Sequence, residues 1–331
     1  MNQGDMAAFL IAAALVGIGV TAIPLQASRA DQPVAVIATA VPLNIRARKQ
    51  IRIGELLYRG GVALRSSDRR FGGFSGLHVD PAGQGLIALS DRGHRINARI
   101  LYDADGNLSG LSNSRMAALL GPNGQRLQGL NADSEALAYL PDGSALVAFE
   151  RRHRIYLYPP SHVPLSGRPV LWSHPANLLE APDNGGIESL AHVGGGLLLA
   201  LSENLRASGG SLAGWIGRAR NWEPLNYVHT PGYYPTDATL MPDGDVAVLE
   251  RKYTVSTGFS VRVMVVPRRS ISPGRAVKGQ LVLHLTAPMT VDNFEGIAAR
   301  RSRDGRRFLY LISDDNFNPL QRTLLMMFET P

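Results

Sequence analysis

Cysteine is absent from this 331-residue chain, and lysine is scarce, because only three of its 34 basic residues are lysine. The first absence excludes disulfide bonds and metal sites built from thiolates, although it neither requires nor forbids export. The arginines contribute to a net charge of +7, but they form no basic stripe interleaved with aromatic residues. We therefore expect no nucleic-acid binding, whereas an anionic small-molecule partner is compatible with so much arginine.

Motifs of nucleophilic and histidine-based chemistry are also absent. The sequence has no Gly-x-Ser-x-Gly motif, the pattern that exposes a catalytic serine on a sharp turn. Its histidines, which include His78, His94 and His153, have no spacing typical of metal ligands. We therefore assign no catalytic residue from the sequence.

The N-terminal 30 residues differ from the rest of the chain. Residues 7–25 are almost continuously apolar, and small residues at 28 and 30 suit a cleavage site before Asp31. This pattern predicts a signal peptide over residues 1–30. No basic residue precedes the apolar run, and its length would also suit an N-terminal membrane anchor. We expect a periplasmic or secreted bacterial protein, with no membrane association once the signal is cleaved.

Glycine and proline are plentiful, at 35 and 21 residues, in a chain that is 45% hydrophobic. Such a composition favours many short strands joined by turns over long helices. Residues 133–150 illustrate this, because an acid, a short apolar run, a Pro-Asp-Gly turn, a second apolar run and another acid follow one another. This pattern is typical of a β-hairpin.

The hairpin pattern occurs five times, with successive copies about 50 to 60 residues apart. The copies cover residues 74–91, 133–150, 187–203, 236–250 and 294–314. Repeats of this kind predict an all-β protein, namely a β-propeller of four-stranded blades. Five repeats carry the motif, so the sequence allows five blades, or six if residues 34–66 form another.

The chain divides into three predicted parts, which are the signal peptide, a linker or edge strand over residues 31–49, and a propeller domain over residues 50–331. The last repeat, residues 295–329, is short by one strand, and residues 51–64 read as one or two strands. An N-terminal strand that completes the final blade would close the ring economically. We expect the protein to be a monomer.

Two acids bracket most of the hairpins. The first acids are Glu135, Glu188, Asp237 and Glu295, with Ser75 as the exception. The second acids are Asp91, Glu150, Glu203, Glu250 and Asp314. Because hairpin strands are antiparallel, both acids of a hairpin lie at the same edge of the sheet. If the first strand is innermost, all of these acids meet at one rim of the central channel.

Carboxylates that converge require a cation or interleaved arginines, and Ca²⁺ prefers oxygen ligands of this kind. We therefore predict that Glu135, Glu188, Asp237 and Glu295 bind a divalent cation, Ca²⁺. Bases follow several of the second acids, and we predict that Arg92, Arg151 and Arg251 hold an anionic group of a substrate. The alternative is that the repeated acids accept backbone N–H groups and hold the blades together.

Five segments of the chain resemble those of the bacterial "esterase-like activity of phytase" family. They are residues 71–77, 88–93, 133–138, 293–298 and 313–323. The resemblance covers about residues 50–331 and implies an exported β-propeller that hydrolyses phosphoesters or other esters. Residues 295–298 (Glu-Gly-Ile-Ala) also resemble an element of calcium-dependent lactonase propellers, which implies a metal on the axis.

The sequence thus predicts a phytase-like or esterase-like hydrolase that acts on phosphate or carboxylic esters with a divalent cation at one rim. The alternative is a propeller without catalytic activity, whose acids are structural and which binds a ligand or a protein. Turnover and a response to calcium would distinguish the two.

Overall fold

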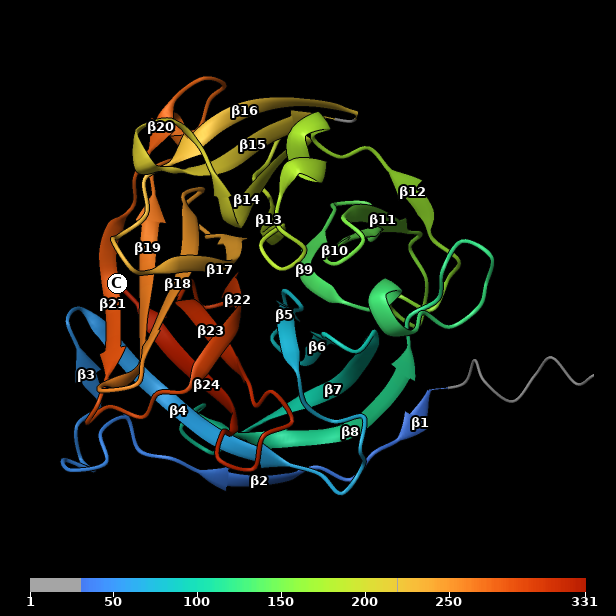
Figure 1. The fold of residues 1–331 in the computed structure, drawn as a ribbon. Helices are drawn as coiled ribbons and strands as arrows, with labels where there is room; N and C mark the ends of the chain where they lie inside the picture. The colour runs from blue at the N-terminus through green and yellow to red at the C-terminus, as the bar shows by residue number, and fades with distance from the viewer. Residues whose placement is uncertain (1–30, 219) are drawn as a thin grey trace, which may run out of the picture. The chain divides into compact units, whose positions relative to one another are not determined.

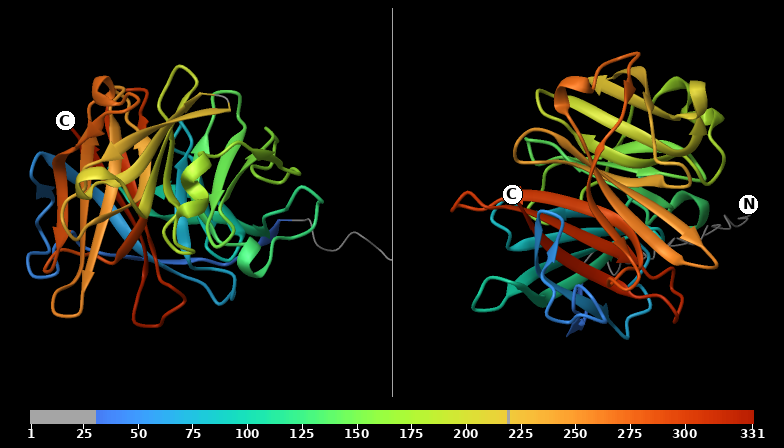
Figure 2. Two further views of the ribbon diagram at one scale, coloured as in Figure 1. Left: turned by 45° about the horizontal axis from the view of Figure 1, so that its top comes forward. Right: turned by 90° about the vertical axis from the view of Figure 1, so that its left-hand side faces the viewer.

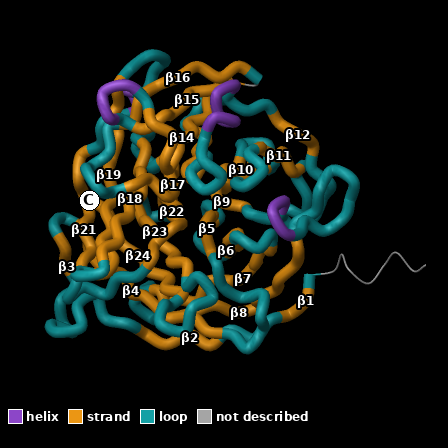
Figure 3. Tube along the Cα trace, in the orientation of Figure 1, coloured by secondary structure: helices purple, strands orange, loops and turns teal. Residues whose placement is uncertain are grey.

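The computed structural model describes residues 31–218 and 220–331. The predicted signal peptide at residues 1–30 lies outside the described residues. Within the described part, no helix is long and apolar enough to cross a membrane. Strands dominate, and Figure 3 shows short helical turns in the outer loops. These 3₁₀ turns are η1 (Gly129–Asn131), η2 (Ala176–Glu180), η3 (Ser208–Gly210) and η4 (Arg268–Ser270).

The described strands of residues 31–331 form five sheets arranged as a ring (Figure 1). Blade 1 contains β5 (Phe74–Val79), β6 (Gly85–Ser90), β7 (His94–Tyr102), β8 (Leu108–Ala118) and the edge strand β1 (Gln32–Pro33). Blade 2 contains β9 (Ser134–Tyr139), β10 (Ala145–Phe149), β11 (Arg154–Tyr158) and β12 (Val170–Trp172). Blade 3 contains β13 (Ile187–His192), β14 (Leu197–Arg206), β15 (Leu212–Arg218), β16 (Asn221–Tyr227) and β20 (Ala276–Val277).

The remaining two blades complete the ring. Blade 4 contains β17 (Tyr234–Leu240), β18 (Val246–Thr254), β19 (Gly258–Val266) and β21 (Gln280–Thr286). Blade 5 contains β22 (Asn293–Arg301), β23 (Arg307–Asp314), β24 (Thr323–Thr330), β4 (Leu56–Arg65), β2 (Ile37–Ala40) and β3 (Arg52–Ile53). The all-β propeller predicted from the repeats is therefore confirmed, and in the described chain it has five blades.

Turn chemistry explains the hairpins. In two of them a Pro-Asp-Gly turn joins the two inner strands, and its glycines, Gly143 and Gly244, have φ values of +83° and +96°. Residues with a Cβ rarely adopt this conformation. Each glycine N–H donates to a carbonyl three residues earlier, at Leu140 (3.0 Å) and Met241 (2.9 Å). The turns therefore fix where each hairpin reverses.

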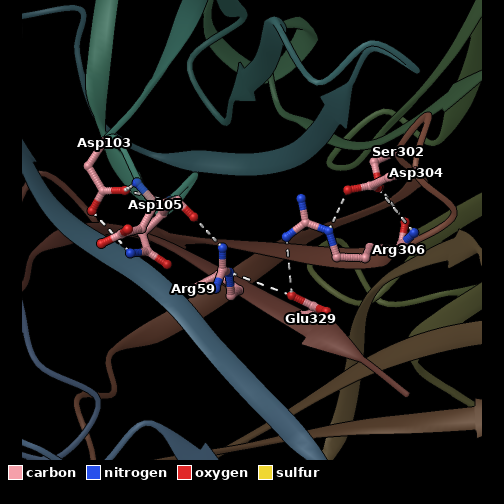
Figure 4. Close-up of polar contacts among 8 residues, drawn as sticks. Arg59, Asp103, Asp105, Ser302, Asp304, Arg306 and Glu329 are labelled. Carbon is pink, nitrogen blue, oxygen red and sulfur yellow. Dashed lines mark hydrogen bonds and ion pairs between the residues drawn. The ribbon is translucent and has the colours of Figure 1, made fainter.

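The N-terminal strand β4 closes the ring, as the short last repeat predicted. It pairs antiparallel with β24, so that one sheet contains both N-terminal and C-terminal strands. At the joint Arg59 donates to the carbonyl of Asp105 in blade 1 (2.6 Å) and forms a salt bridge with Glu329 (3.6 Å). Arg306 reaches the same carboxylate (3.7 Å), as Figure 4 shows.

The core is divided among the blade interfaces. Among the described residues, five clusters of buried apolar side chains each join two neighbouring blades. A strand between two such clusters is covered on both faces, which is why β10 (Ala-Leu-Val-Ala-Phe) is buried throughout and shows no alternation. Burial of apolar surface between blades is thus the main stabilising contribution.

Candidate functional site

The first strand of every hairpin is the innermost of its blade, as predicted. Around the channel β5, β9, β13, β17 and β22 contact one another in a closed sequence. Figure 2 shows the strands running between the two rims of the ring. The starts of these inner strands and the ends of their hairpin partners share one rim, which we call the acid rim. The expected convergence of the acids can therefore be examined there.

Each described inner strand has a β-bulge at its start. The residues that the pairing register skips are Ser75, Glu135, Glu188, Thr236 and Glu295. A bulge leaves one residue unpaired and changes the direction of its side chain. Four of these positions match the repeat that the sequence predicted. In β17 the equivalent residue is Thr236, so the sequence alignment on Asp237 is one position too far.

Asp237 makes contacts of a structural kind. Its two carboxylate oxygens accept the backbone N–H groups of Ala238 (2.8 Å) and Ile297 (2.8 Å). The second bond crosses from β17 to β22, and the side chain is buried, with a pKa raised well above its usual range by that burial. Asp237 therefore joins two blades, which is the role that the structural alternative gives to the repeated acids.

Glu150 and Glu250, from the second set of acids, each accept hydrogen bonds through one carboxylate oxygen. Oε1 of Glu150 accepts the N–H groups of Gly185 (2.8 Å) and Gly186. Oε1 of Glu250 accepts the hydroxyl of Tyr227 (2.9 Å). Both side chains are 0% exposed, and Oε2 of each has no hydrogen-bond partner among the described residues. An unpartnered buried carboxylate oxygen is costly unless a cation or a proton compensates it.

Three acids of blade 2 and its preceding loop form a cluster, which we call the carboxylate cluster. Asp133, Glu135 and Glu150 can each bring one oxygen within 4.8 Å of the others. Glu135 and Glu150 are buried, and the neighbouring Arg151 pairs with Asp133 (3.0 Å). This donor set consists of oxygen atoms alone, which suits a hard divalent cation. The carboxylate cluster could therefore bind a metal ion.

The acids of the rim influence one another electrostatically. Burial raises the pKa of Glu135 well above its usual range, and the charges of Glu188 and Glu150 raise it further. Burial likewise raises the pKa of Glu188, with Glu150 and Glu203 adding to the effect. Such mutual repulsion means that carboxyls from blades 2 and 3 face a common space, as the hairpin geometry predicted.

Intermediate pKa values occur at three further acids. Burial raises the pKa of Glu150 to about 7, although N–H donation from Gly186 opposes the rise. Burial raises the pKa of Asp91 to about 6 and that of Asp314 to about 9, and the charge of Glu295 contributes to both. Part of the rim therefore changes its charge near neutral pH.

Arg251 neutralises the side of the rim formed by blades 3 to 5. Its guanidinium forms salt bridges with Glu203 (3.3 Å) and Glu295 (3.1 Å) and donates to the side chain of Asn293. Burial lowers the pKa of Arg251, but Glu295 and Glu203 outweigh it, so the pKa is raised overall. On one side of the acid rim, Arg251 therefore compensates the charges of Glu203 and Glu295. At the carboxylate cluster, the buried Oε2 of Glu150 has no hydrogen-bond partner among the described residues.

The three arginines predicted to hold a substrate lie in different settings. Arg251 is enclosed by acids, and Arg151 is bound to Asp133 of the carboxylate cluster. Arg92 is exposed, and its guanidinium lies 3.3 Å from the centre of the Phe317 ring. Of the predicted metal ligands, Glu135 belongs to the carboxylate cluster, Glu188 lies near it, and Glu295 is paired with Arg251.

Sequence reasoning missed Asp133 as a candidate ligand and Thr236 as the bulged residue of β17. Asp133 lies two residues before Glu135 and could have been found as part of an acid pair. The other repeats have no acid at that position, so the alignment of the repeats does not indicate it. Thr236 could not be distinguished from Asp237, because a bulge is a feature of pairing and leaves no mark in a single sequence.

Comparison with known proteins gives one family and several distant structures. Residues 69–317 match the phytase-like family described as "esterase-like activity of phytase". No protein of curated function matches the chain.

Three solved structures illustrate the distant likeness. A candidate gluconolactonase is 13% identical, with a TM-score of 0.44 and coverage of 92% of this chain and 93% of that chain. A luciferin-regenerating enzyme is 10% identical, with a TM-score of 0.44 and coverage of 88% and 96%. A streptogramin B lyase is 8% identical, with a TM-score of 0.41 and coverage of 90% and 98%. At these values the likeness indicates nothing about activity.

Proposed function

The chain belongs to the phytase-like family, and we propose that it is an exported hydrolase of phosphate or carboxylic esters that uses Ca²⁺ at the acid rim. The observation that carries the proposal is the carboxylate cluster of Asp133, Glu135 and Glu150, whose oxygens can lie within 4.8 Å of one another. Family membership supports hydrolysis as the class of reaction, and the cluster supports the cation.

The donor set fits a hard cation on two grounds. All of its ligand atoms are carboxylate oxygens, which Ca²⁺ prefers and which Zn²⁺ sites usually combine with nitrogen or sulfur. Oε2 of Glu150 is buried and has no hydrogen-bond partner in the described chain, so a cation would satisfy an atom that the protein leaves unsatisfied. Asp133, Glu135 and Glu150 would hold the ion, with Glu188 beside them.

A bound divalent cation would polarise the ester and make a bound water more acidic. The residues of the chain would supply the rest of the chemistry. Burial raises the pKa of Glu188 well above its usual range, and the charges of Glu150 and Glu203 add to the rise. A carboxylic acid of this kind can protonate the leaving oxygen of an ester. Arg92 would attract an anionic substrate from solvent.

The test is hydrolysis of p-nitrophenyl phosphate and p-nitrophenyl acetate with and without a chelator. We expect turnover that needs Ca²⁺ and that falls by about 100-fold or more in Glu135→Gln, as is usual when a group that stabilises transition-state charge is lost. Glu329→Gln is the matched control, because this acid lies in the network at the opposite rim (Figure 4). Chelator-resistant activity that survives in Glu135→Gln would rule out the assignment.

A propeller without catalytic activity is the second candidate. It is favoured by the hydrogen bonds of Asp237, Glu150 and Glu250, which fix strands and loops to one another. Absence of turnover on both esters, together with no change in melting temperature on adding Ca²⁺, would favour this candidate over the hydrolase.

A further inference from the structure

A hollow of about 700 Å³ lies at the acid rim, where blade 5 meets blade 1. Two loops form it, residues 65–71 after β4 and residues 315–323 between β23 and β24, which approach each other in Figure 1. Four arginines line it, namely Arg65, Arg69, Arg92 and Arg322. The proposed cation site uses none of the arginines of the two loops.

The acids of this hollow are already engaged. Asp68 accepts two hydrogen bonds from the guanidinium of Arg70, at 2.9 Å and 2.6 Å. Oδ1 of Asp315 accepts the backbone N–H groups of Gly73 (3.1 Å) and Phe317 (3.1 Å). Asp68 is thus paired with Arg70 and Asp315 holds backbone groups, and neither forms a salt bridge with any described arginine that lines the hollow.

Three of the four arginines have no acidic partner at salt-bridge distance among the described residues. Arg322 forms a salt bridge with Asp292 (3.1 Å). In the described structure, no salt bridge involves Arg65, Arg69 or Arg92. Guanidinium groups that line one hollow without forming salt bridges repel one another, and an oxyanion lowers that repulsion while accepting their hydrogen bonds.

The loop that holds Phe317 is fixed rather than loose. Asn316 and Phe317 both have positive φ values, 49° and 50°, which residues with a Cβ seldom adopt. Their N–H groups donate to Asp314 (2.6 Å) and Asp315 (3.1 Å), which holds this backbone in place. Strained backbone of this kind is concentrated at functional sites. Here it positions the aromatic ring on which the guanidinium of Arg92 stacks.

The hollow adjoins the acid rim. Gly73 separates the two, since a Cβ at this position would overlap both the carboxylate of Asp91 and the ring of Phe317 (2.6 Å). Asp91 is one of the rim acids and directly precedes Arg92. A group bound in the hollow would therefore lie close to Asp91, at the edge of the acid rim.

We infer that Arg65, Arg69 and Arg92 form a binding site for a phosphate group beside the acid rim. The ligand is a phosphoryl group, either on a substrate or as free inorganic phosphate. Its negative charge and several oxygens match three guanidinium groups that line one hollow and form no salt bridge within the described chain. The part of the inference that concerns substrates rests on the proposed function, whereas the binding of phosphate does not.

The experiment measures binding of inorganic phosphate by calorimetry at low ionic strength, where screening is weak. The probe variant is Arg65→Ala/Arg69→Ala, and Arg92→Ala is measured beside it. We expect a rise in Kd of about tenfold or more for each arginine removed, since each supplies a charge-assisted hydrogen bond. The control is Arg301→Ala/Arg303→Ala, which removes the same charge from exposed residues at the opposite rim and should leave Kd within about twofold.

Two further measurements separate the sources of the phosphate. A higher KM for p-nitrophenyl phosphate in the double variant, with an unchanged KM for p-nitrophenyl acetate, shows that the site holds a substrate group. Loss of phosphate binding without that KM change shows a site for free phosphate. If the protein hydrolyses neither ester but still binds phosphate through these arginines, the proposed function fails and the site remains. Equal phosphate binding by the probe and control variants would overturn the inference.

Discussion

Glu150 combines two roles within one side chain. Its Oε1 accepts N–H groups from the loop that precedes β13, which fixes blade 2 to blade 3. Its Oε2 is buried without a partner among the described residues and belongs to the carboxylate cluster. Structural and functional accounts of a repeated acid therefore do not exclude each other, because each oxygen has its own environment.

This division gives a prediction about cation affinity. Glu150→Gln can keep the amide oxygen as acceptor for the two N–H groups while it removes the charge, so we expect Ca²⁺ affinity to fall by about tenfold or more. Glu250→Gln is the matched control, because that acid is equally buried and also has an unpartnered Oε2, but it lies outside the carboxylate cluster. Calorimetry that finds the same loss of affinity in both variants would contradict the cluster.

The residues of the acid rim could largely be predicted from the sequence. Which of these acids bind backbone groups and which remain available for a cation could not. Convergence of the acids follows from hairpin geometry, and the mutual effects on Glu135 and Glu188 bear it out. Which acids are engaged by backbone groups depends on loops from the next blade, such as Gly185, which is 35 residues from Glu150. The hollow between blades 5 and 1 depends on contacts that are distant in sequence, such as the hydrogen bond between Gly73 and Asp315, which are 242 residues apart. No local pattern in the sequence indicates such a contact.

At the scale of elements, the strand β4 closes the ring, because its pairing with β24 places N-terminal and C-terminal strands of the described chain in one sheet. Its close fit against blade 1 depends on Gly60, which has a φ of +94°. A Cβ there would lie 2.5 Å from the carbonyl oxygen of Leu108 in β8. Closure of the ring therefore relies on a backbone approach that a larger residue cannot make.

Gly60→Ala should destabilise the protein more than an alanine substitution at a glycine where the positive φ is the only unfavourable feature. The matched control is Gly305→Ala, since Gly305 has a similar φ of +88° but would place its Cβ in open space. We expect Gly60→Ala to cost about 1–3 kcal/mol more than the control in the free energy of unfolding, because atoms must move apart at the joint. Urea unfolding measures both, and equal losses would show that the joint between β4 and β8 is not tight.

The elements themselves were the most predictable part of the protein. Alternating turns and apolar runs located the hairpins, and the deficit of one strand in the last repeat predicted the pairing that β4 makes with β24. The number of blades could not be decided, because residues 34–66 read equally as a blade or as additions to existing ones. In the structure the strands within these residues, β2, β3 and β4, all belong to blade 5.

For the whole molecule, the buried acids couple stability to pH. Asp314 has a folded pKa of about 9 and Glu150 of about 7, against usual values of 3.8 and 4.5. Between pH 7 and pH 9 the folded protein thus holds protons that the unfolded chain has already released. Stability must then fall as pH rises through this window. Burial lowers the pKa values of His78, His94, His192, His229 and His284, so these histidines contribute little to the slope above about pH 7.5.

We therefore expect the melting temperature to decrease from pH 7 to pH 9 without divalent cations, and Ca²⁺ to restore more of it at pH 9 than at pH 7. Asp314→Asn should flatten this slope, because the amide oxygen can still accept the N–H of Asn316 but carries no titrating proton. Potassium chloride at equal ionic strength controls for screening. A melting temperature that changes with neither pH nor Ca²⁺ in this window would be inconsistent with mutual repulsion among the acids of the rim.

The most direct test is an anomalous difference map from crystals grown with Ca²⁺. If carboxyls carried by separate strands are gathered to hold a cation, the strongest peak should lie among the side chains of Asp133, Glu135 and Glu150. A map with no peak there, from crystals in which calcium is visible at other positions, would contradict the account.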